Sequence, residues 1–203
     1  LCIYSDHFSY VIDTSMSMKG PRIRSLKPEF KSSIQSLKPF VQFNIVNFGG
    51  DISFMSSRLT GDKEMALRNS AEWEMTLGTR TFDAFERAYF QEGLDTVFLL
   101  TDGAPICGQV NKSELIMRVM TLMNRYRQVA IWCVDFEALP ERLAFMKSMV
   151  AEYWGKLDSV PVAAIFNDGE GEKSGKNSGK KKKKAGGGKK KRRSHSKNRF
   201  IVS

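Results

Sequence analysis

Oxygen-bearing side chains gather where an apolar run ends near the start of the chain. The run Tyr10-Val-Ile is followed by Asp13-Thr-Ser15-Met-Ser17 and then by a Gly-Pro pair. Aromatic and β-branched residues that stop at turn residues predict a buried strand, with a loop and a helix after it. Carboxylate and hydroxyl oxygens are the hard ligands that Mg²⁺ takes. The stretch therefore predicts a cation site or a helix N-cap, since Asp and Ser are also preferred capping residues.

Two later stretches carry side chains of the same kind. Gly78-Thr79-Arg80 opens a helical pattern, and an apolar run ends in Thr101-Asp102-Gly103. In open α/β sheets, ligands bind outside the carboxyl ends of the parallel strands. Asp13 and Asp102 both fall at such ends, which favours a binding site there over two separate helix caps.

Together these motifs resemble the von Willebrand factor A domain family over roughly residues 8–160. The family's metal-ion-dependent adhesion site combines Asp-x-Ser-x-Ser, a Thr after the second helix, and an Asp that ends the fourth strand. The resemblance implies that Mg²⁺ or Mn²⁺ is bound by the hydroxyls of Ser15, Ser17 and Thr79, while Asp13 and Asp102 act directly or through water. It also implies a function in protein–protein interaction, in which a carboxylate of the partner protein completes the metal's coordination.

The elements that must position these residues alternate between strand and helix. This alternation predicts an α/β fold with a doubly wound, Rossmann-like, mostly parallel six-stranded sheet and helices on both faces. The turn Gly49-Gly50-Asp51 predicts a hairpin, which places one antiparallel strand at the sheet edge. Pro28 is expected to delay the start of its helix or to kink it. Apolar periodicity predicts strands over 8–13, 41–48, 52–55, 95–101, 129–134 and 157–162, and helices over 22–38, 62–76, 82–90, 114–127 and 140–154.

The net charge of +10 is unevenly distributed along the 203 residues. Residues 1–166 hold 18 Lys and Arg against 19 Asp and Glu, whereas residues 167–203 hold 14 against 3. Because the second segment has no apolar periodicity, we expect a folded domain over 1–166 and a disordered Gly/Lys/Arg-rich basic tail over 167–203. The tail's candidate polyanion-binding residues are Lys180, Lys181, Lys182, Lys183, Lys184, Lys189, Lys190, Lys191, Arg192 and Arg193.

Several functional classes are disfavoured by what the sequence contains. The two histidines, His7 and His195, precede the first strand and lie in the tail, so a Ser-His-Asp or Cys-His pair within the fold is not expected. Long apolar runs are also missing, which predicts no transmembrane segment in this chain. The three cysteines lack metal-type spacing, and we expect reduced thiols and an intracellular setting, in the cytoplasm or nucleus.

Two other functions remain open alongside the interaction domain. One is a nucleic-acid or polyanion-associated protein that acts mainly through the basic tail. The other is a Mg²⁺-dependent phosphoryl hydrolase with an Asp after the first strand. Such a hydrolase needs a second carboxylate two residues further on as acid and base, and that position holds Ser15. The sequence therefore predicts a protein that is not an enzyme.

Deleting residues 180–193 is expected to abolish binding of the chain to RNA or DNA, because residues 1–166 have a net charge close to zero. Fluorescence anisotropy with a labelled oligonucleotide measures this binding, which should weaken steeply with added salt as counterions are released. A control that replaces the segment with Gly and Ser keeps the chain length and should also fail to bind. Binding that ignores salt, or survives the deletion, would contradict the prediction.

Overall fold

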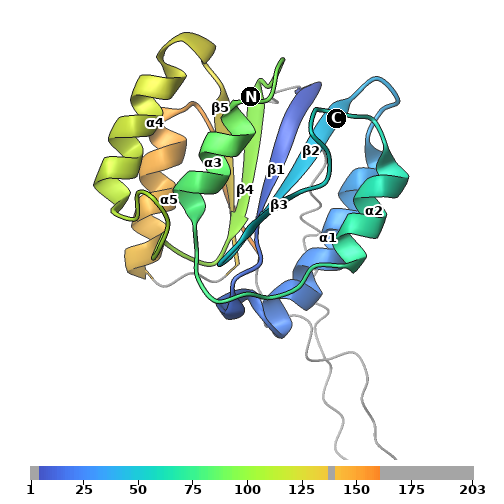
Figure 1. Cartoon of the computed structure of the whole chain (residues 1–203), viewed down its shortest axis with the longest axis horizontal. Helices are drawn as coiled ribbons and strands as arrows, with labels where there is room; N and C mark the ends of the chain where they lie inside the picture. The colour runs from blue at the N-terminus through green and yellow to red at the C-terminus, as the bar shows by residue number, and fades with distance from the viewer. Residues whose placement is uncertain (1–4, 137–139, 161–203) are drawn as a thin grey trace, which may run out of the picture.

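Six strands form one sheet in the order β3-β2-β1-β4-β5-β6 (Figure 1). The computed structural model describes residues 5–136 and 140–160. Strand β3 pairs antiparallel with β2, and the other neighbouring strands are parallel. The predicted mostly parallel sheet with one antiparallel edge strand is confirmed. The strands are β1 (His7–Asp13), β2 (Gln42–Phe48), β3 (Ile52–Phe54), β4 (Thr96–Thr101), β5 (Ala130–Asp135) and β6 (Leu157–Ser159).

Helices cover both faces of this sheet, as the alternation of elements predicted (Figure 1). One face is covered by α1 (Pro21–Ser36) and α2 (Lys63–Ala71), and the other by α3 (Thr81–Tyr89), α4 (Ser113–Arg127) and α5 (Pro140–Glu152). Each face has its own apolar core. Successive side chains of a strand point to opposite faces, so Tyr10 and Ile12 enter the core under α1, while Val11 enters the other. The central strand β1 is therefore buried on both faces from Phe8 to Asp13, including the polar side chains of Ser9 and Asp13.

Helix α1 begins at Pro21 and continues through Pro28 to Ser36. The expectation that Pro28 would delay the helix start is wrong. Pro28 and Arg24 are both exposed, so water can replace the backbone donor that the proline ring removes from the Arg24 carbonyl.

Helix α2 ends at Ala71, five residues before the predicted end. In the segment that follows, Thr76 pairs with the loop after β1. Thr76 N donates to Thr14 O at 2.9 Å, and Met16 N donates to Thr76 O at 3.0 Å. This pairing is long-range, so the apolar periodicity of residues 62–76 carried no sign of it.

The predicted boundary at residue 166 and the whole basic tail lie outside the described residues. The polyanion-binding residues of the tail therefore remain a prediction from sequence. Among the described residues, no helix combines the length and the apolar composition needed to cross a bilayer.

The chain passes from α5 to β6 through a close backbone contact at Gly155. A Cβ atom at this position would lie 1.5 Å from the carbonyl oxygen of Ile131 in β5. The preceding residue, Trp154, adopts the left-handed conformation with φ 53°. Gly155 thus lets the end of α5 rest against the sheet.

Replacing Gly155 with Ala is expected to lower the free energy of unfolding by about 3 kcal/mol or more, because the added methyl group meets backbone rather than a movable side chain. Urea denaturation followed by circular dichroism measures the loss. The matched control is Gly61→Ala, whose Cβ would be 3.4 Å from the nearest heavy atom, Val41 O, and which should change stability by less than about 0.5 kcal/mol. A similarly small change for Gly155→Ala would contradict the contact.

Candidate metal site

The predicted metal ligands lie on loops at the carboxyl ends of neighbouring strands. Asp13 is the last residue of β1, and Asp102 follows the last residue of β4. These strands pair in parallel, with Ile12 opposite Leu100, so both carboxylates reach the same edge of the sheet. We call Asp13, Ser15, Ser17, Thr79 and Asp102 the candidate site.

The carboxylate of Asp13 is fully buried and hydrogen-bonded at both oxygens. Its Oδ1 accepts from Ser15 N at 2.8 Å, and its Oδ2 accepts from Thr101 Oγ1 at 2.5 Å. Burial raises the pKa of Asp13 to about 6, with a smaller contribution from the charge of Asp102, while the bonds from Ser15 and Thr101 oppose the rise. Thr101 thus positions Asp13. It belongs to the Thr-Asp-Gly motif, but sequence analysis assigned it no role.

A hydrogen-bonded row of oxygens joins the loop after β1 to the end of β4. Ser17 Oγ donates to Asp102 Oδ1 at 2.8 Å, and the hydroxyls of Ser15 and Ser17 are 2.9 Å apart. A serine hydroxyl has one proton. Because Ser17 donates its proton to Asp102, Ser15 donates to Ser17. Four of the five predicted residues are therefore brought together in one network that starts at Asp13.

Thr79 reaches the same edge from a third loop. Within the described part of the chain, it forms no hydrogen bond with the other four residues of the candidate site. It is buried; its N donates to Cys107 Sγ at 3.1 Å and its O accepts from Ile106 N at 3.3 Å. Gly49 and Gly50 in the β2–β3 turn let the loop that carries Thr79 come close. A Cβ atom at Gly49 would lie 2.2 Å from Thr76 Oγ1, and one at Gly50 would lie 2.2 Å from Leu77 O.

A cation from α1 that was not among the predicted site residues faces Asp102. Arg22 Nη1 lies 3.1 Å from Asp102 Oδ2 in an ion pair. The guanidinium also donates to the carbonyl oxygens of Ser17 at 2.9 Å and Phe136 at 2.8 Å. Asp102 Oδ2 is buried without a hydrogen-bond partner, so the nearby charge compensates it. The sequence signal was weak, since Arg22 is one of many basic residues.

The donor atoms fit a hard divalent cation. They are carboxylate and hydroxyl oxygens, which suit Mg²⁺ or Mn²⁺, and one carboxylate oxygen has no hydrogen-bond donor. Among the described residues, no group of three His, Cys, Asp or Glu side chains is placed to hold a metal ion. An ion at this edge would therefore depend on the hydroxyls of the serine and threonine residues as well as on the two carboxylates.

No family model matches the chain. It is 29% identical over 160 residues to inter-alpha-trypsin inhibitor heavy chain H4 of Sus scrofa, covering 72% of this chain and 17% of that protein. It is 26% identical over 180 residues to von Willebrand factor A domain-containing protein 3B of Homo sapiens, covering 82% of this chain and 13% of that protein. The chain thus spans less than a fifth of the length of either relative.

The fold is similar to that of a solved von Willebrand factor type A structure from Catenulispora acidiphila, with a TM-score of 0.65. The two sequences are 14% identical, and the match covers 81% of this chain and 41% of the other. A likeness at this identity shows a shared fold.

Asp13 should make the metal-free domain less stable as pH rises. Its pKa of about 6 in the folded state exceeds the usual 3.8, so the folded protein holds this proton more tightly than the unfolded chain. The contribution is fully present below about pH 4 and is lost as pH rises through about 6, by up to about 3 kcal/mol. Asp13→Asn removes the titrating proton, so parent and variant should differ in stability by an amount that changes over this window.

Urea denaturation in chelator at several pH values between 4 and 7 measures that difference. The control is Asp158→Asn, since Asp158 lies in an exposed ion pair with Lys156 at 2.8 Å. A difference between parent and Asp13→Asn that stays constant with pH would show that Asp13 does not titrate there.

Proposed function

We propose that this chain, whose sequence and fold are similar to those of von Willebrand factor A proteins, is a protein-interaction module that binds Mg²⁺ or Mn²⁺ at the candidate site. A bound ion supplies an electrophilic position that a carboxylate of the partner protein can occupy. The observation that carries the proposal is the row of oxygens from Asp13 through Ser15 and Ser17 to Asp102.

The hydrogen bonds within the candidate site hold its oxygen atoms in fixed positions, which supports this role. Asp13 holds the backbone of the loop through Ser15 N, which keeps the two serine hydroxyls side by side. Ser15 is buried, whereas Ser17 is exposed. The row therefore reaches the surface at Ser17, between the buried carboxylates of Asp13 and Asp102, and a partner's side chain has access there.

Charge at the candidate site favours an acidic partner. Asp13 and Asp102 carry two negative charges when ionised, and Arg22 offsets one of them. A divalent cation would change the local sum from −1 to +1, which attracts an incoming carboxylate. Arg22 thus acts in two ways: it weakens the attraction for the metal, and it strengthens the attraction for the partner's acidic group.

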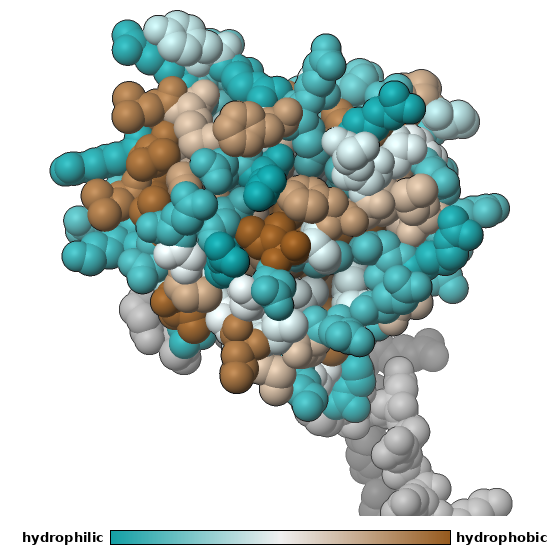
Figure 2. Space-filling model, in the orientation of Figure 1, coloured by the Kyte–Doolittle hydropathy of each residue, from teal (hydrophilic) through white to brown (hydrophobic). Residues whose placement is uncertain are grey.

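Exposed apolar side chains surround the candidate site and suit a protein partner. Met16 is 39% exposed, Leu77 82% and Ile106 64%. Backbone bonds place them on the three loops of the site, since Met16 pairs with Thr76 and Ile106 with Thr79. Figure 2 shows apolar side chains at the lower edge of this face, where the carboxyl ends of the strands lie in Figure 1. Exposed apolar side chains beside a polar site give a protein partner surface from which contact can exclude water.

Binding is favoured over bond cleavage by the chemistry of Ser15. A phosphoryl hydrolase of the kind considered above requires a carboxylate at this position to transfer a proton. A serine hydroxyl does not do so near neutral pH, but it coordinates a cation well. We therefore propose that the domain is not an enzyme.

Millimolar Mg²⁺ or Mn²⁺ is expected to raise the unfolding temperature of the protein, since a ligand that binds the folded state stabilises it by mass action. Differential scanning calorimetry with and without chelator measures the shift. Asp102→Asn should abolish the shift without unfolding the protein, whereas the control Asp158→Asn should keep it. A parent protein that gains no stability from either metal would rule out the metal site.

Arg22→Gln tests whether the positive charge of Arg22 weakens metal binding at the candidate site. Removing a positive charge that faces Asp102 should tighten metal binding by about three- to tenfold, as expected for partial screening of two charges roughly 6 Å apart. Isothermal titration calorimetry with MnCl₂ measures this affinity. Unchanged or weaker metal binding would show that Arg22 supports the metal-binding geometry instead of competing with the ion.

A further inference from the structure

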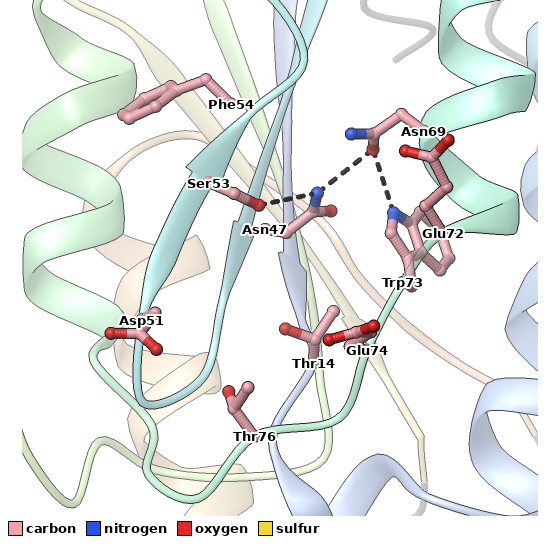
Figure 3. Close-up of a pocket in the computed structure, with 10 residues that line it drawn as sticks. All are labelled: Thr14, Asn47, Asp51, Ser53, Phe54, Asn69, Glu72, Trp73, Glu74 and Thr76. Atoms are coloured by element: carbon pink, nitrogen blue, oxygen red, sulfur yellow. Dashed lines mark hydrogen bonds between the residues drawn. The ribbon is translucent and has the colours of Figure 1, made fainter.

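A polar cavity lies beside the β2–β3 hairpin and shares no lining residue with the candidate site. It measures about 440 Å³. Asp51 comes from the hairpin turn, while Glu72 and Glu74 come from the segment after α2 (Figure 3). We call it the acidic pocket. Its lining residues are Thr14, Asn47, Asp51, Ser53, Phe54, Asn69, Glu72, Trp73, Glu74 and Thr76.

A relay of hydrogen bonds leaves one buried acceptor in this pocket without a donor. Trp73 Nε1 is a donor only, and it donates to Asn69 Oδ1 at 3.0 Å. That oxygen also accepts from Asn47 Nδ2 at 3.1 Å, so the orientation of the Asn47 amide is determined. Asn47 Nδ2 donates to Ser53 Oγ as well, at 3.3 Å (Figure 3). Asn47 is 6% exposed, and its Oδ1 has no hydrogen-bond partner.

The charges around the pocket are of one sign. Asp51, Glu72 and Glu74 line it and are exposed, and no Lys, Arg or His is among the lining residues. Lys27 lies over the ring of Trp73, 6.0 Å from its centroid, but does not line the pocket. The pocket therefore combines an unsatisfied buried acceptor with three negative charges, and its complement is a cation that carries N–H donors.

A metal ion is a poor match for this arrangement. Among the described residues, no three acidic, histidine or cysteine side chains are placed to hold an ion, so these three carboxylates do not converge on one point. The pocket's hydroxyls do not form a row like that of the candidate site, because those of Thr14, Ser53 and Thr76 bond separately to Phe48 O, Asn47 Nδ2 and Gly50 N. A water molecule would satisfy Asn47 Oδ1 but would not be attracted by the net charge of the three carboxylates. An ammonium or guanidinium group at the end of an alkyl chain can donate to Asn47 Oδ1 and is also attracted by that charge.

We propose that the acidic pocket binds a Lys or Arg side chain of a basic peptide segment. The volume lies within the range of small-ligand sites, roughly 300–1,000 Å³. Phe54, which is 40% exposed, offers an apolar wall for the alkyl part of such a side chain. The head group would donate to Asn47 Oδ1 and lie between the carboxylates of the hairpin turn and those of the segment after α2.

The basic segment has two sources, this chain or another protein. Residues 167–203 of this chain carry 14 Lys and Arg. The described residues end at Val160, and the 20 residues up to Lys180 can extend by about 65 Å, enough to reach any surface of a domain of this size. The chain thus contains the required chemistry within reach of its own pocket.

The test uses the full chain in chelator, so its outcome is independent of the candidate site. A fluorescent peptide with the sequence of residues 180–193 is titrated, and anisotropy reports binding. The variant Glu72→Gln with Glu74→Gln should weaken binding by about tenfold, as expected for the loss of two charge pairs. The control, Glu92→Gln with Glu114→Gln, makes the same charge change at exposed positions outside the pocket and should weaken it less than twofold.

A third protein, in which the ten basic residues of 180–193 are replaced by Gln, identifies the source. Tighter peptide binding by this protein shows that the chain's own tail occupies the pocket, because a competitor has been removed. Unchanged binding that still depends on Glu72 and Glu74 assigns the pocket to a basic segment of another protein. Equal loss in the pocket variant and the control, or no loss in either, overturns the proposal.

Discussion

The buried carboxylate of Asp13 is the constraint on which the arrangement of this edge of the sheet depends. Removing a carboxylate from water is costly unless hydrogen bonds compensate it. The compensation comes from Ser15 N and Thr101 Oγ1, one from the loop after β1 and the other from the end of β4. Satisfying Asp13 therefore brings two segments that are distant in sequence into one structure, and it orients the serine hydroxyls toward Asp102.

The candidate site also contains a positive charge, that of Arg22, which balances the carboxylate of Asp102. Arg22 approaches Asp102 from the first turn of α1 and also binds the carbonyl oxygens of Ser17 and Phe136. These contacts tie the start of α1 to the residue that follows β5. Any cation bound at Asp102 shares that carboxylate with a guanidinium already in place, so the affinity of the metal and the charge offered to a partner are set together.

The loop between α2 and α3 connects the two sites. Thr14 and Thr76 line the acidic pocket, and their backbones pair with each other beside Ser15. Gly49 and Gly50 allow this pairing because larger residues would collide with Thr76 and Leu77. The same segment thus supports the hydroxyl row on one side and forms part of the pocket on the other.

The sequence by itself determined the alternation of elements, the mostly parallel sheet, and the placement of Asp13 and Asp102 at strand ends. These features depend on local periodicity and on the direction of parallel strands, both of which are visible in a linear pattern. Only the tertiary structure decided that α2 stops at Ala71, that Thr101 holds Asp13, that Arg22 faces Asp102, and that Asn47 retains an unsatisfied oxygen. Each of these depends on atoms from segments distant in the chain, and no local pattern records which segments will meet.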